Sequence, residues 1–123
     1  MTDTIFDTTT ATETVDTWLA AYGEPDRERR TELVRRVWAA DGELIDPPLA
    51  GAGHDALVAL ADAVLEMFPG HTFRRTTDVD GHHRYARYGW ELVASDGGVA
   101  LGGQDLVELN ANGQLQKVVG FFG

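Results

Sequence analysis

The sequence predicts an α+β fold, with three helices first and a mainly antiparallel sheet after them. Apolar residues recur at helical spacing through the first half of the chain. From about His71 onward the period changes to two, which is typical of strands. Short turn sequences then divide this second half, as hairpin connections do. They are Asp80-Gly81, Asp96-Gly97-Gly98 and Asn112-Gly113.

Size and composition limit the classes of protein that fit. A chain of 123 residues with 43% hydrophobic content can build one core but not two. The formal net charge of -10 argues against nucleic acid or an anionic membrane surface as a partner. The sequence has no cysteine, which excludes disulfides and thiolate chemistry. Its first residues contain neither a basic start nor an apolar run, so we expect a cytoplasmic protein.

A disordered tail is expected over residues 1–9, which are rich in threonine and aspartate and lack hydrophobic periodicity. A single domain is expected over residues 10–123. Thr10 and Glu13 have the spacing of a capping box, which predicts a first helix from about residue 11 to residue 22.

Two further helices are expected before the sheet. Asp26 is a suitable cap for the second, which buries Trp38 and ends at a turn near Asp41-Gly42. The third runs from about residue 54 to residue 68. The predicted strands cover residues 43–46, 71–79, 83–94, 99–110 and 114–122.

Asp46 lies where the short strand 43–46 ends at a proline step. On the two-residue period it shares a face with Leu44, so if Leu44 points into the core then Asp46 does too. A carboxyl group buried beside leucine is unfavourable unless it is hydrogen-bonded or protonated. Asp46 is therefore expected to be either well satisfied or chemically useful.

Asp105 and Tyr22 are further candidates for the same site. Asp105 lies on a strand whose two faces both carry apolar residues, so the alternation does not decide which way it points. Tyr22 ends the apolar stripe of the first helix, where a tyrosine is also consistent with plain core packing. An aspartate on a strand is often exposed or paired with arginine, and Arg75 and Arg87 are available for such pairing.

The histidines do not predict a metal site, and no cofactor is expected. His82 and His83 are adjacent and are expected to face opposite ways, so that they cannot both bind one ion. His71, which begins a strand, and His82 are both candidates for an auxiliary acid-base role in the pocket. Trp90 is expected to line a pocket or the core, with Tyr88 on the opposite face.

Several segments, taken in order, resemble a known superfamily. They are residues 18–22, 37–42, 46–47, 68–71 and 113–123. From about residue 12 onward the chain is similar to the nuclear transport factor 2-like (NTF2-like) and SnoaL-like proteins, which include ketosteroid isomerase and polyketide cyclases. This resemblance implies a cone-shaped NTF2-like fold, in which three N-terminal helices pack on a strongly curved sheet and enclose a pocket. It also implies a homodimer through the outer face of the sheet, where Val118, Gly120 and Phe122 are expected.

Ketosteroid isomerase resembles the chain in more detail. Its general-base aspartate lies in an Asp-Pro step after the second helix, as Asp46 does. Its hydrogen-bonding tyrosine lies near the end of the first helix, like Tyr22, and its protonated aspartic acid lies on a strand before the last turn, like Asp105. The resemblance therefore implies Asp46 as the proton shuttle, with Tyr22 and Asp105 as donors to the oxyanion. The loop 48–53 and the glycines near residue 102 depart from that family's pattern, so a steroid substrate is not implied.

We therefore expect an enzyme without a cofactor that moves a proton next to the carbonyl group of a small apolar compound, as an isomerase or a cyclase does. The residues expected to contact this compound are Trp18, Leu44, Phe68, Trp90 and His71. A noncatalytic module that binds a small molecule or supports assembly is the alternative. A third choice, an epoxide hydrolase-like enzyme, would require Arg75 or Arg87 inside the pocket.

Overall fold

The computed structural model describes residues 7–47 and 49–123. Within these residues the elements are α1 (Thr8–Gly23), α2 (Arg27–Val37), β1 (Trp38–Ile45), β2 (Ala50–Ala52), α3 (His54–Met67), β3 (Thr72–Arg75), β4 (Asp80–His82), β5 (Tyr85–Val93), β6 (Val99–Leu109) and β7 (Leu115–Phe122). Residues 1–6 of the expected tail lie outside the described part. None of the three helices is long and apolar enough to cross a membrane.

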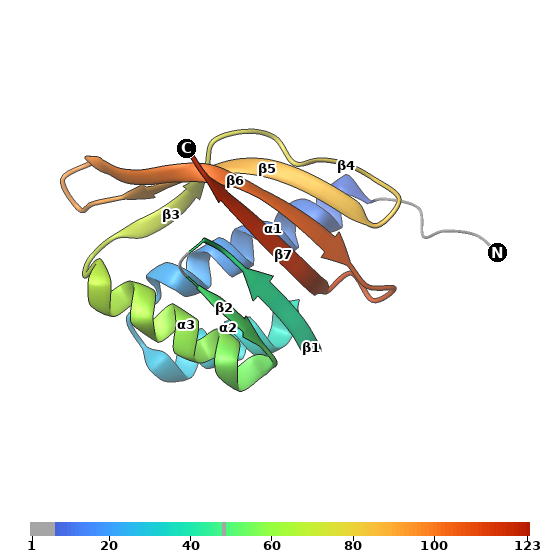
Figure 1. Cartoon of the computed structure of the whole chain (residues 1–123), viewed down its shortest axis with the longest axis horizontal. Helices are drawn as coiled ribbons and strands as arrows, with labels where there is room; N and C mark the ends of the chain where they lie inside the picture. Colours follow the sequence, from blue (N-terminus) through green and yellow to red (C-terminus); the bar gives the residue numbers. More distant parts are fainter. Residues whose placement is uncertain (1–6, 48) are drawn as a thin grey trace.

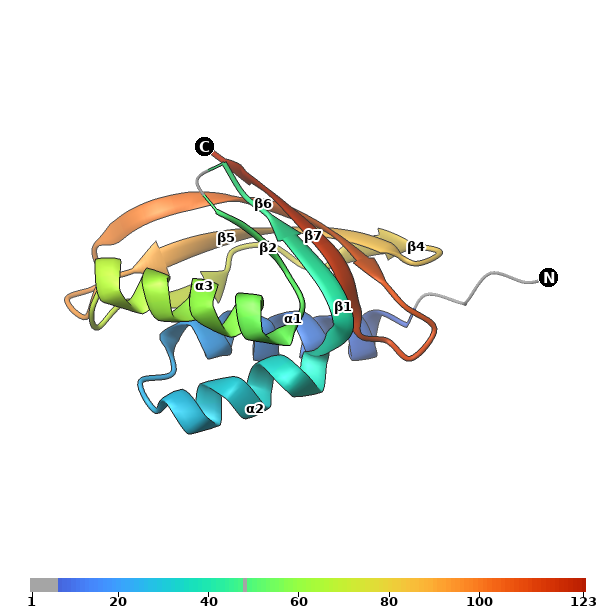
Figure 2. The ribbon, with the colours of Figure 1, turned by 60° about the horizontal axis from the view of Figure 1, so that its bottom comes forward.

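The described strands form one curved sheet in the order β2-β1-β7-β6-β5-β3, with β4 also paired to β5. The pairing is antiparallel except between β1 and β7, which run parallel. Figure 1 shows the three helices on one side of this sheet. Figure 2 shows the sheet curving over α1 and α3, with α2 farthest from it. The expected α+β fold with a mainly antiparallel, curved sheet is confirmed.

The first helix begins earlier than predicted. The Asp7 carboxylate accepts hydrogen bonds from the backbone N–H groups of Thr9 at 3.0 Å and of Thr10 at 3.2 Å, and so caps α1. The predicted capping box of Thr10 and Glu13 is therefore wrong, and residues 8 and 9 belong to the helix rather than to a tail. The apolar stripe is buried as expected, with Val15, Trp18, Leu19 and Tyr22 in the core.

The second helix is shorter than predicted. Asp26 caps it as expected, by accepting a hydrogen bond from a backbone N–H of the first turn at 3.1 Å. The helix ends before Trp38, however, and Trp38 begins β1. The predicted turn at Asp41-Gly42 lies inside this strand, where the register against β7 shifts. Gly42 is needed there, because a Cβ would lie 2.4 Å from the Trp38 ring.

Two of the three predicted hairpin turns are confirmed. Gly97 and Gly113 have φ angles of 91° and 77° in the β5–β6 and β6–β7 connections, a conformation that favours glycine. Residues 80–81 lie in β4 instead, and the chain turns at His83, whose φ is 53°. This turn brings His82 and His83 together, with their Nδ1 atoms 3.0 Å apart, so the expectation that they face opposite ways is wrong.

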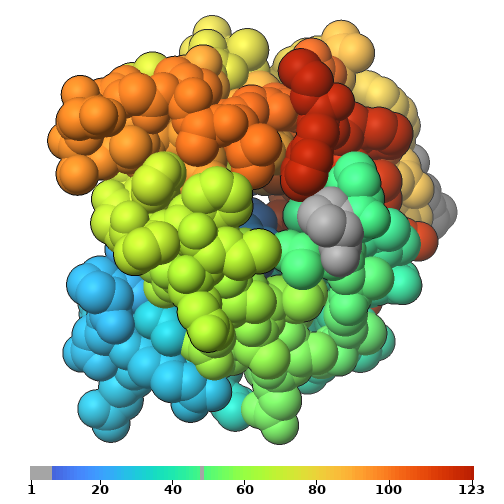
Figure 3. All heavy atoms as spheres, turned by 60° about the vertical axis from the view of Figure 1, so that its left-hand side comes forward, coloured from blue at the N-terminus to red at the C-terminus, as the bar shows by residue number. Residues whose placement is uncertain are grey.

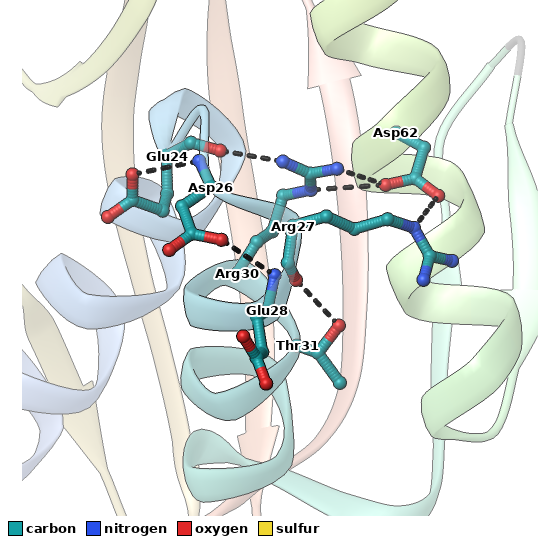
Figure 4. Close-up of polar contacts among 7 residues, drawn as sticks. All are labelled: Glu24, Asp26, Arg27, Glu28, Arg30, Thr31 and Asp62. Carbon is teal, nitrogen blue, oxygen red and sulfur yellow. Dashed lines mark hydrogen bonds and ion pairs between the residues drawn. The ribbon is translucent and has the colours of Figure 1, made fainter.

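A buried arginine holds α3 against α2 (Figure 4). The Arg30 side chain is 7% exposed, and its Nε and Nη2 both donate to Asp62 Oδ1 on α3. Its Nη1 donates to the Glu24 carbonyl, just after α1, at 2.7 Å. Arg27 donates to the other oxygen of Asp62 at 3.1 Å. These bonds fix the position of α3, whose C-terminal end forms part of the wall of a cavity.

The outer face of the sheet differs from the expected one. Val118 is fully buried, and Gly120 pairs with Asp105, which is also buried. Val118, Gly120 and Phe122 are alternate residues of β7, so all three lie on the face that meets the helices. Placing Val118, Gly120 and Phe122 on the outer face was therefore wrong. The outward positions carry Leu106 and Phe121 instead, which are 47% and 60% exposed.

Candidate active site

A cavity of about 230 Å³ lies between the concave face of the sheet and the helices. Figure 3 shows a hollow between α3 and the ends of β6 and β7, with atoms of α1 at its bottom. The wall is apolar over most of its surface, because leucine, valine and aromatic side chains form it. It includes four of the five residues expected to contact a ligand, namely Trp18, Leu44, Phe68 and Trp90.

Asp46 reaches the cavity from the end of β1. Leu44, two residues earlier, is 1% exposed, so the predicted inward face of this strand is confirmed. The backbone turns directly after Asp46, whose N–H donates to the Leu49 carbonyl at 2.7 Å. No side chain of the described residues donates a hydrogen bond to the Asp46 carboxylate. Burial raises the pKa of Asp46 to about 6.

Asp105 faces the cavity from β6, which settles the orientation that the sequence left open. Its side chain is buried, and two donors on β5 hold the carboxylate. The Tyr88 hydroxyl donates to Oδ2 at 2.7 Å, and the Trp90 indole N–H donates to Oδ1 at 3.0 Å. Tyr88 lies directly opposite Asp105 in the sheet. The strand pairing therefore places one donor, and the next inward position on β5 places the other.

Tyr88 is the polar side chain of this site that was not predicted. Its expected orientation, opposite to Trp90, is wrong, because residues two apart on a strand share a face. That alternation is visible in the sequence and is sufficient to find Tyr88. Gly103 is also required, since a Cβ there would lie 2.8 Å from the Trp90 ring and 2.3 Å from the Phe121 carbonyl oxygen.

The two carboxyl groups meet beside Gly120 on β7, the strand that separates β1 from β6. A Cβ at Gly120 would lie 2.0 Å from Asp46 Oδ1 and 3.2 Å from Asp105 Oδ1, so both oxygens approach one point. Burial raises the pKa of Asp105 to about 6; the charge of Asp46 adds to this effect, and the hydrogen bonds from Tyr88 and Trp90 oppose it. An apolar cavity thus holds two neighbouring carboxyls whose protons leave close to neutral pH.

Tyr22 is brought to the same cavity by the last turn of α1. Burial, together with the charges of Asp46 and Asp105, raises the pKa of Tyr22 well above its ordinary value. Its ring packs against Trp18 and Phe73, with centroid distances of 4.2 and 4.9 Å. No hydrogen bond joins its hydroxyl to another described residue. The neutral phenol is therefore able to donate to a ligand.

Four other candidate residues lie outside the cavity wall, namely His71, His82, Arg75 and Arg87. His71 Nδ1 lies 3.1 Å from the Pro69 carbonyl oxygen, and His71 does not line the cavity, so its predicted place there is wrong. Arg75 and Arg87 form ion pairs with exposed aspartates and do not line it either. The epoxide hydrolase-like arrangement, which requires one of these arginines inside, is thus not formed. No group of three or more metal-binding side chains is found in the described part of the chain.

No family model matches the chain, and no curated protein does. A solved structure from Agrobacterium tumefaciens, named as a candidate isomerase of the SnoaL-like family, is 37% identical; the match covers 94% of this chain and 98% of that one, with a TM-score of 0.88.

Two more distant structures share the fold. A candidate SnoaL-like polyketide cyclase from Jannaschia is 16% identical, with a TM-score of 0.73 over 93% of this chain and 85% of that one. A protein with a ketosteroid isomerase-like fold from Catenulispora acidiphila, solved in complex with trimethylamine, is 12% identical, with a TM-score of 0.72 over 90% and 85%. Because the Agrobacterium protein is 37% identical over almost the full length of both chains, this chain belongs to the SnoaL-like family.

Proposed function

We propose that the protein is an enzyme without a cofactor that moves a proton at the carbon next to the carbonyl group of a small apolar compound, as isomerases and cyclases do. The observation that supports this proposal is the carboxyl pair. Asp46 and Asp105 meet in an apolar cavity, and burial raises the pKa of each to about 6. A general base works best when its pKa is near the operating pH, because it is then ionised and still takes up a proton readily.

Asp46 is the base in this proposal. No described side chain donates to its carboxylate, so its lone pairs are available to a ligand. Asp105 is repelled by the charge of Asp46, which favours the protonated form of Asp105 once Asp46 is ionised. A protonated Asp105 accepts hydrogen bonds from Tyr88 and Trp90 and still has its own hydrogen to donate.

Removal of the proton leaves negative charge on the carbonyl oxygen of the ligand, which becomes an enolate. Asp105 and Tyr22 donate hydrogen bonds to this oxygen. Donors held in place in an apolar cavity stabilise the enolate more than the neutral ketone, and so lower the barrier. Asp46 then returns the proton to a different carbon, which completes an isomerisation. An intramolecular aldol cyclisation begins with the same step.

The pH dependence of turnover tests this proposal. The active form has Asp46 ionised and Asp105 protonated, so kcat/KM should be bell-shaped with a maximum at about pH 6. A cyclohexenone whose double bond is not conjugated with the carbonyl is a suitable small substrate, because its conjugation is followed by ultraviolet absorption. A bell centred far from this pH would contradict the assignment of the two carboxyls.

Carbon-13 NMR of labelled aspartates gives the second test. With the signals assigned through the Asp46→Asn and Asp105→Asn variants, both carboxyls should titrate at about pH 6. Titration of both near the ordinary value of 3.8 would remove the proposed base and donor. Titration as expected, with binding of a phenolate but no turnover of any small ketone, would identify a noncatalytic binding module instead.

A further inference from the structure

The charge inside the cavity is not balanced by the protein. Among the described residues that line it, Asp46 and Asp105 are acidic, and none is lysine, arginine or histidine. The lysine and arginine side chains that form ion pairs do so with carboxylates elsewhere, such as Arg30 with Asp62. Once both cavity carboxyls are ionised, they face an apolar space without a cation. Such an arrangement is unfavourable until a counter-charge enters.

Aromatic rings form a continuous part of the cavity wall. Successive ring centroids are 4.9 Å apart from Tyr22 to Phe73, 5.4 Å from Phe73 to Trp90 and 5.8 Å from Trp90 to Phe122. Neighbouring rings are inclined by 47° to 82° rather than stacked, so the wall is curved. The π-electrons of such rings attract cations that carry apolar groups.

These features distinguish an organic cation from a metal ion. Hard metal cations take six or more oxygen ligands, or retain several waters. As oxygen ligands, the described residues of the wall offer two carboxylates and one phenol, and the rest of the wall is mostly apolar. An alkylammonium ion needs only the carboxylates for its charge and the apolar wall for its carbon atoms.

We propose that the cavity binds a small alkylammonium ion, with its nitrogen beside Asp46 and Asp105 and its alkyl groups against the rings of Tyr22, Phe73 and Trp90. The ion occupies the place that a shared proton takes at lower pH, and it removes the repulsion between the two carboxylates. This inference concerns the charge of the ligand and does not rest on the proposed proton transfer.

The entrance suits such a ligand. Met67 and Phe122, which line the cavity from α3 and β7, are 56% and 42% exposed. The rim is therefore apolar, and the alkyl groups of a ligand contact apolar side chains as they enter. The net charge of -10 raises the concentration of cations near the protein.

A matched pair of probes tests this proposal by calorimetry. One probe is choline; the other is its neutral carbon isostere, in which a tert-butyl group replaces the trimethylammonium group. At about pH 8, where both carboxyls are ionised, choline should bind at least about tenfold more tightly than the isostere. Equal affinities, or no binding of choline, would overturn the proposal.

The preference for the cation should depend on pH, because choline keeps its charge and only the protein titrates. The titratable groups that face the cavity are Asp46 from β1, Asp105 from β6 and Tyr22 from α1, with Tyr88 of β5 bonded to Asp105; the described residues of α3, β3 and β7 contribute none. The preference should fall towards one at about pH 5, as the carboxyls protonate. A preference that does not change with pH would place the cation elsewhere.

Variants locate the bound cation. Asp46→Asn should weaken choline about tenfold or more and leave the isostere unchanged, which also shows that the cavity is intact. Glu13→Gln removes the same charge from an exposed position of α1 and should leave both affinities within about twofold. Asp105→Asn repeats the test if Asp46→Asn fails to fold. Equal losses in Asp46→Asn and Glu13→Gln would mean that only net charge matters, which contradicts the site.

Turnover of the cyclohexenone, measured on the same samples without choline, separates the two proposals. Turnover without a preference for choline overturns the ammonium site alone. A pH-dependent preference for choline without turnover of any ketone supports the ammonium site and overturns the enzymatic proposal alone.

Discussion

Arg30 and Asp105 are the charged residues that the described chain buries, at 6% and 7% exposed, and their surroundings are opposite. Arg30 donates to Asp62 and to the Glu24 carbonyl, so a carboxylate and a backbone oxygen satisfy its charge. Asp105 accepts from two neutral donors and has another acid, Asp46, beside it. One buried charge has its counter-ion inside the protein, and the other does not.

This difference separates a structural role from a functional one. A buried ion pair with complete hydrogen bonds holds elements in place, and removal of one partner costs stability. Two adjacent carboxyls without a cation cost stability as they stand, and such groups with shifted pKa values gather at functional sites. Substitutions in the Arg30–Asp62 ion pair should therefore lower stability more than activity, and substitutions in the Asp46–Asp105 pair should lower activity more than stability.

Asp46→Asn should have the largest effect, and the effect should be on activity. Loss of a general base lowers kcat/KM by about a hundredfold to ten-thousandfold. The free energy of unfolding should stay the same or rise, because a buried ionisable group is removed. Steady-state kinetics and chemical denaturation measure the two quantities. A variant that loses both activity and stability would place Asp46 in the structural class with Arg30.

Asp62→Asn should show the reverse pattern. It leaves the Arg30 guanidinium buried without a counter-charge, and because Asp62 itself is 32% exposed, the loss should be about 2 to 3 kcal/mol of unfolding free energy. Asp55→Asn, at the exposed ion pair with Arg35, is the matched control and should change stability by no measurable amount. In folded Asp62→Asn protein, kcat/KM should stay within a few-fold of the parent.

The cavity carboxyls and Asp62 should also differ in how their contributions to stability depend on pH. The pKa values of Asp46 and Asp105 are raised above 3.8, so each group contributes stability that is complete below about pH 3.8 and lost as the pH rises through about 6. At Asp62, burial alone would raise the pKa, but the bonds and charges of Arg30 and Arg27 outweigh it and lower the pKa. The contribution of Asp62 is therefore present above its ordinary pKa and is lost only in stronger acid.

Unfolding near pH 5 should accordingly require about 1 to 2 kcal/mol more than near pH 8, after allowance for the partial exposure of Asp46. The double variant Asp46→Asn, Asp105→Asn should lose most of this slope, and Glu13→Gln should keep it. Denaturation curves across this range measure the difference. A slope of the opposite sign in the parent protein would mean that the two cavity carboxyls are stabilised as anions.

Gly120→Ala should damage the site with a small effect on the fold. The added Cβ would lie 2.0 Å from Asp46 Oδ1, and that carboxyl can rotate away, so kcat/KM should fall about tenfold or more. Gly103→Ala is the contrasting variant, because its Cβ would meet the Phe121 carbonyl oxygen at 2.3 Å, and backbone cannot rotate away. Thermal unfolding should show a clear loss for Gly103→Ala and little for Gly120→Ala.

The outer face of the sheet differs from both regions, because its described residues include exposed apolar side chains and no buried charge. We propose that a homodimer forms there, through the exposed Leu106 and Phe121. Phe121→Asp should then give a monomer by light scattering, and Met67→Asp, at the rim of the cavity, should not. A parent protein that is already monomeric at micromolar concentration would remove this proposal.

The sequence predicted the parts of the fold that depend on local pattern. Helical spacing, the two-residue period and two glycine turns identified most of the elements, and the same period placed Asp46 beside Leu44. Trp38 was misplaced because its apolar side chain fits the helical stripe, although the chain there pairs with β7. That pairing joins residues far apart in sequence, and no local pattern shows it.

The candidate site was predictable only in part for the same reason. Tyr22 and Asp46 follow from local spacing and from the family resemblance. The orientation of Asp105 depends on which face of β6 meets the helices, and both faces carry apolar residues. The role of Gly120 has no signal in the sequence, because it exists only when β7 lies between the strands that carry the two acids.

The position of β7 also makes the carboxyl pair a long-range feature of the fold. Asp105 lies on β6 and Asp46 directly follows β1; these two strands do not pair with each other, and each pairs with β7 instead. A partly folded chain in which β7 has not yet docked has both acids but no pair. Recovery of ligand binding after dilution from denaturant therefore reports the docking of this strand, and recovery of helical circular dichroism reports the helices; a common rate for both would mean that the domain folds in one step.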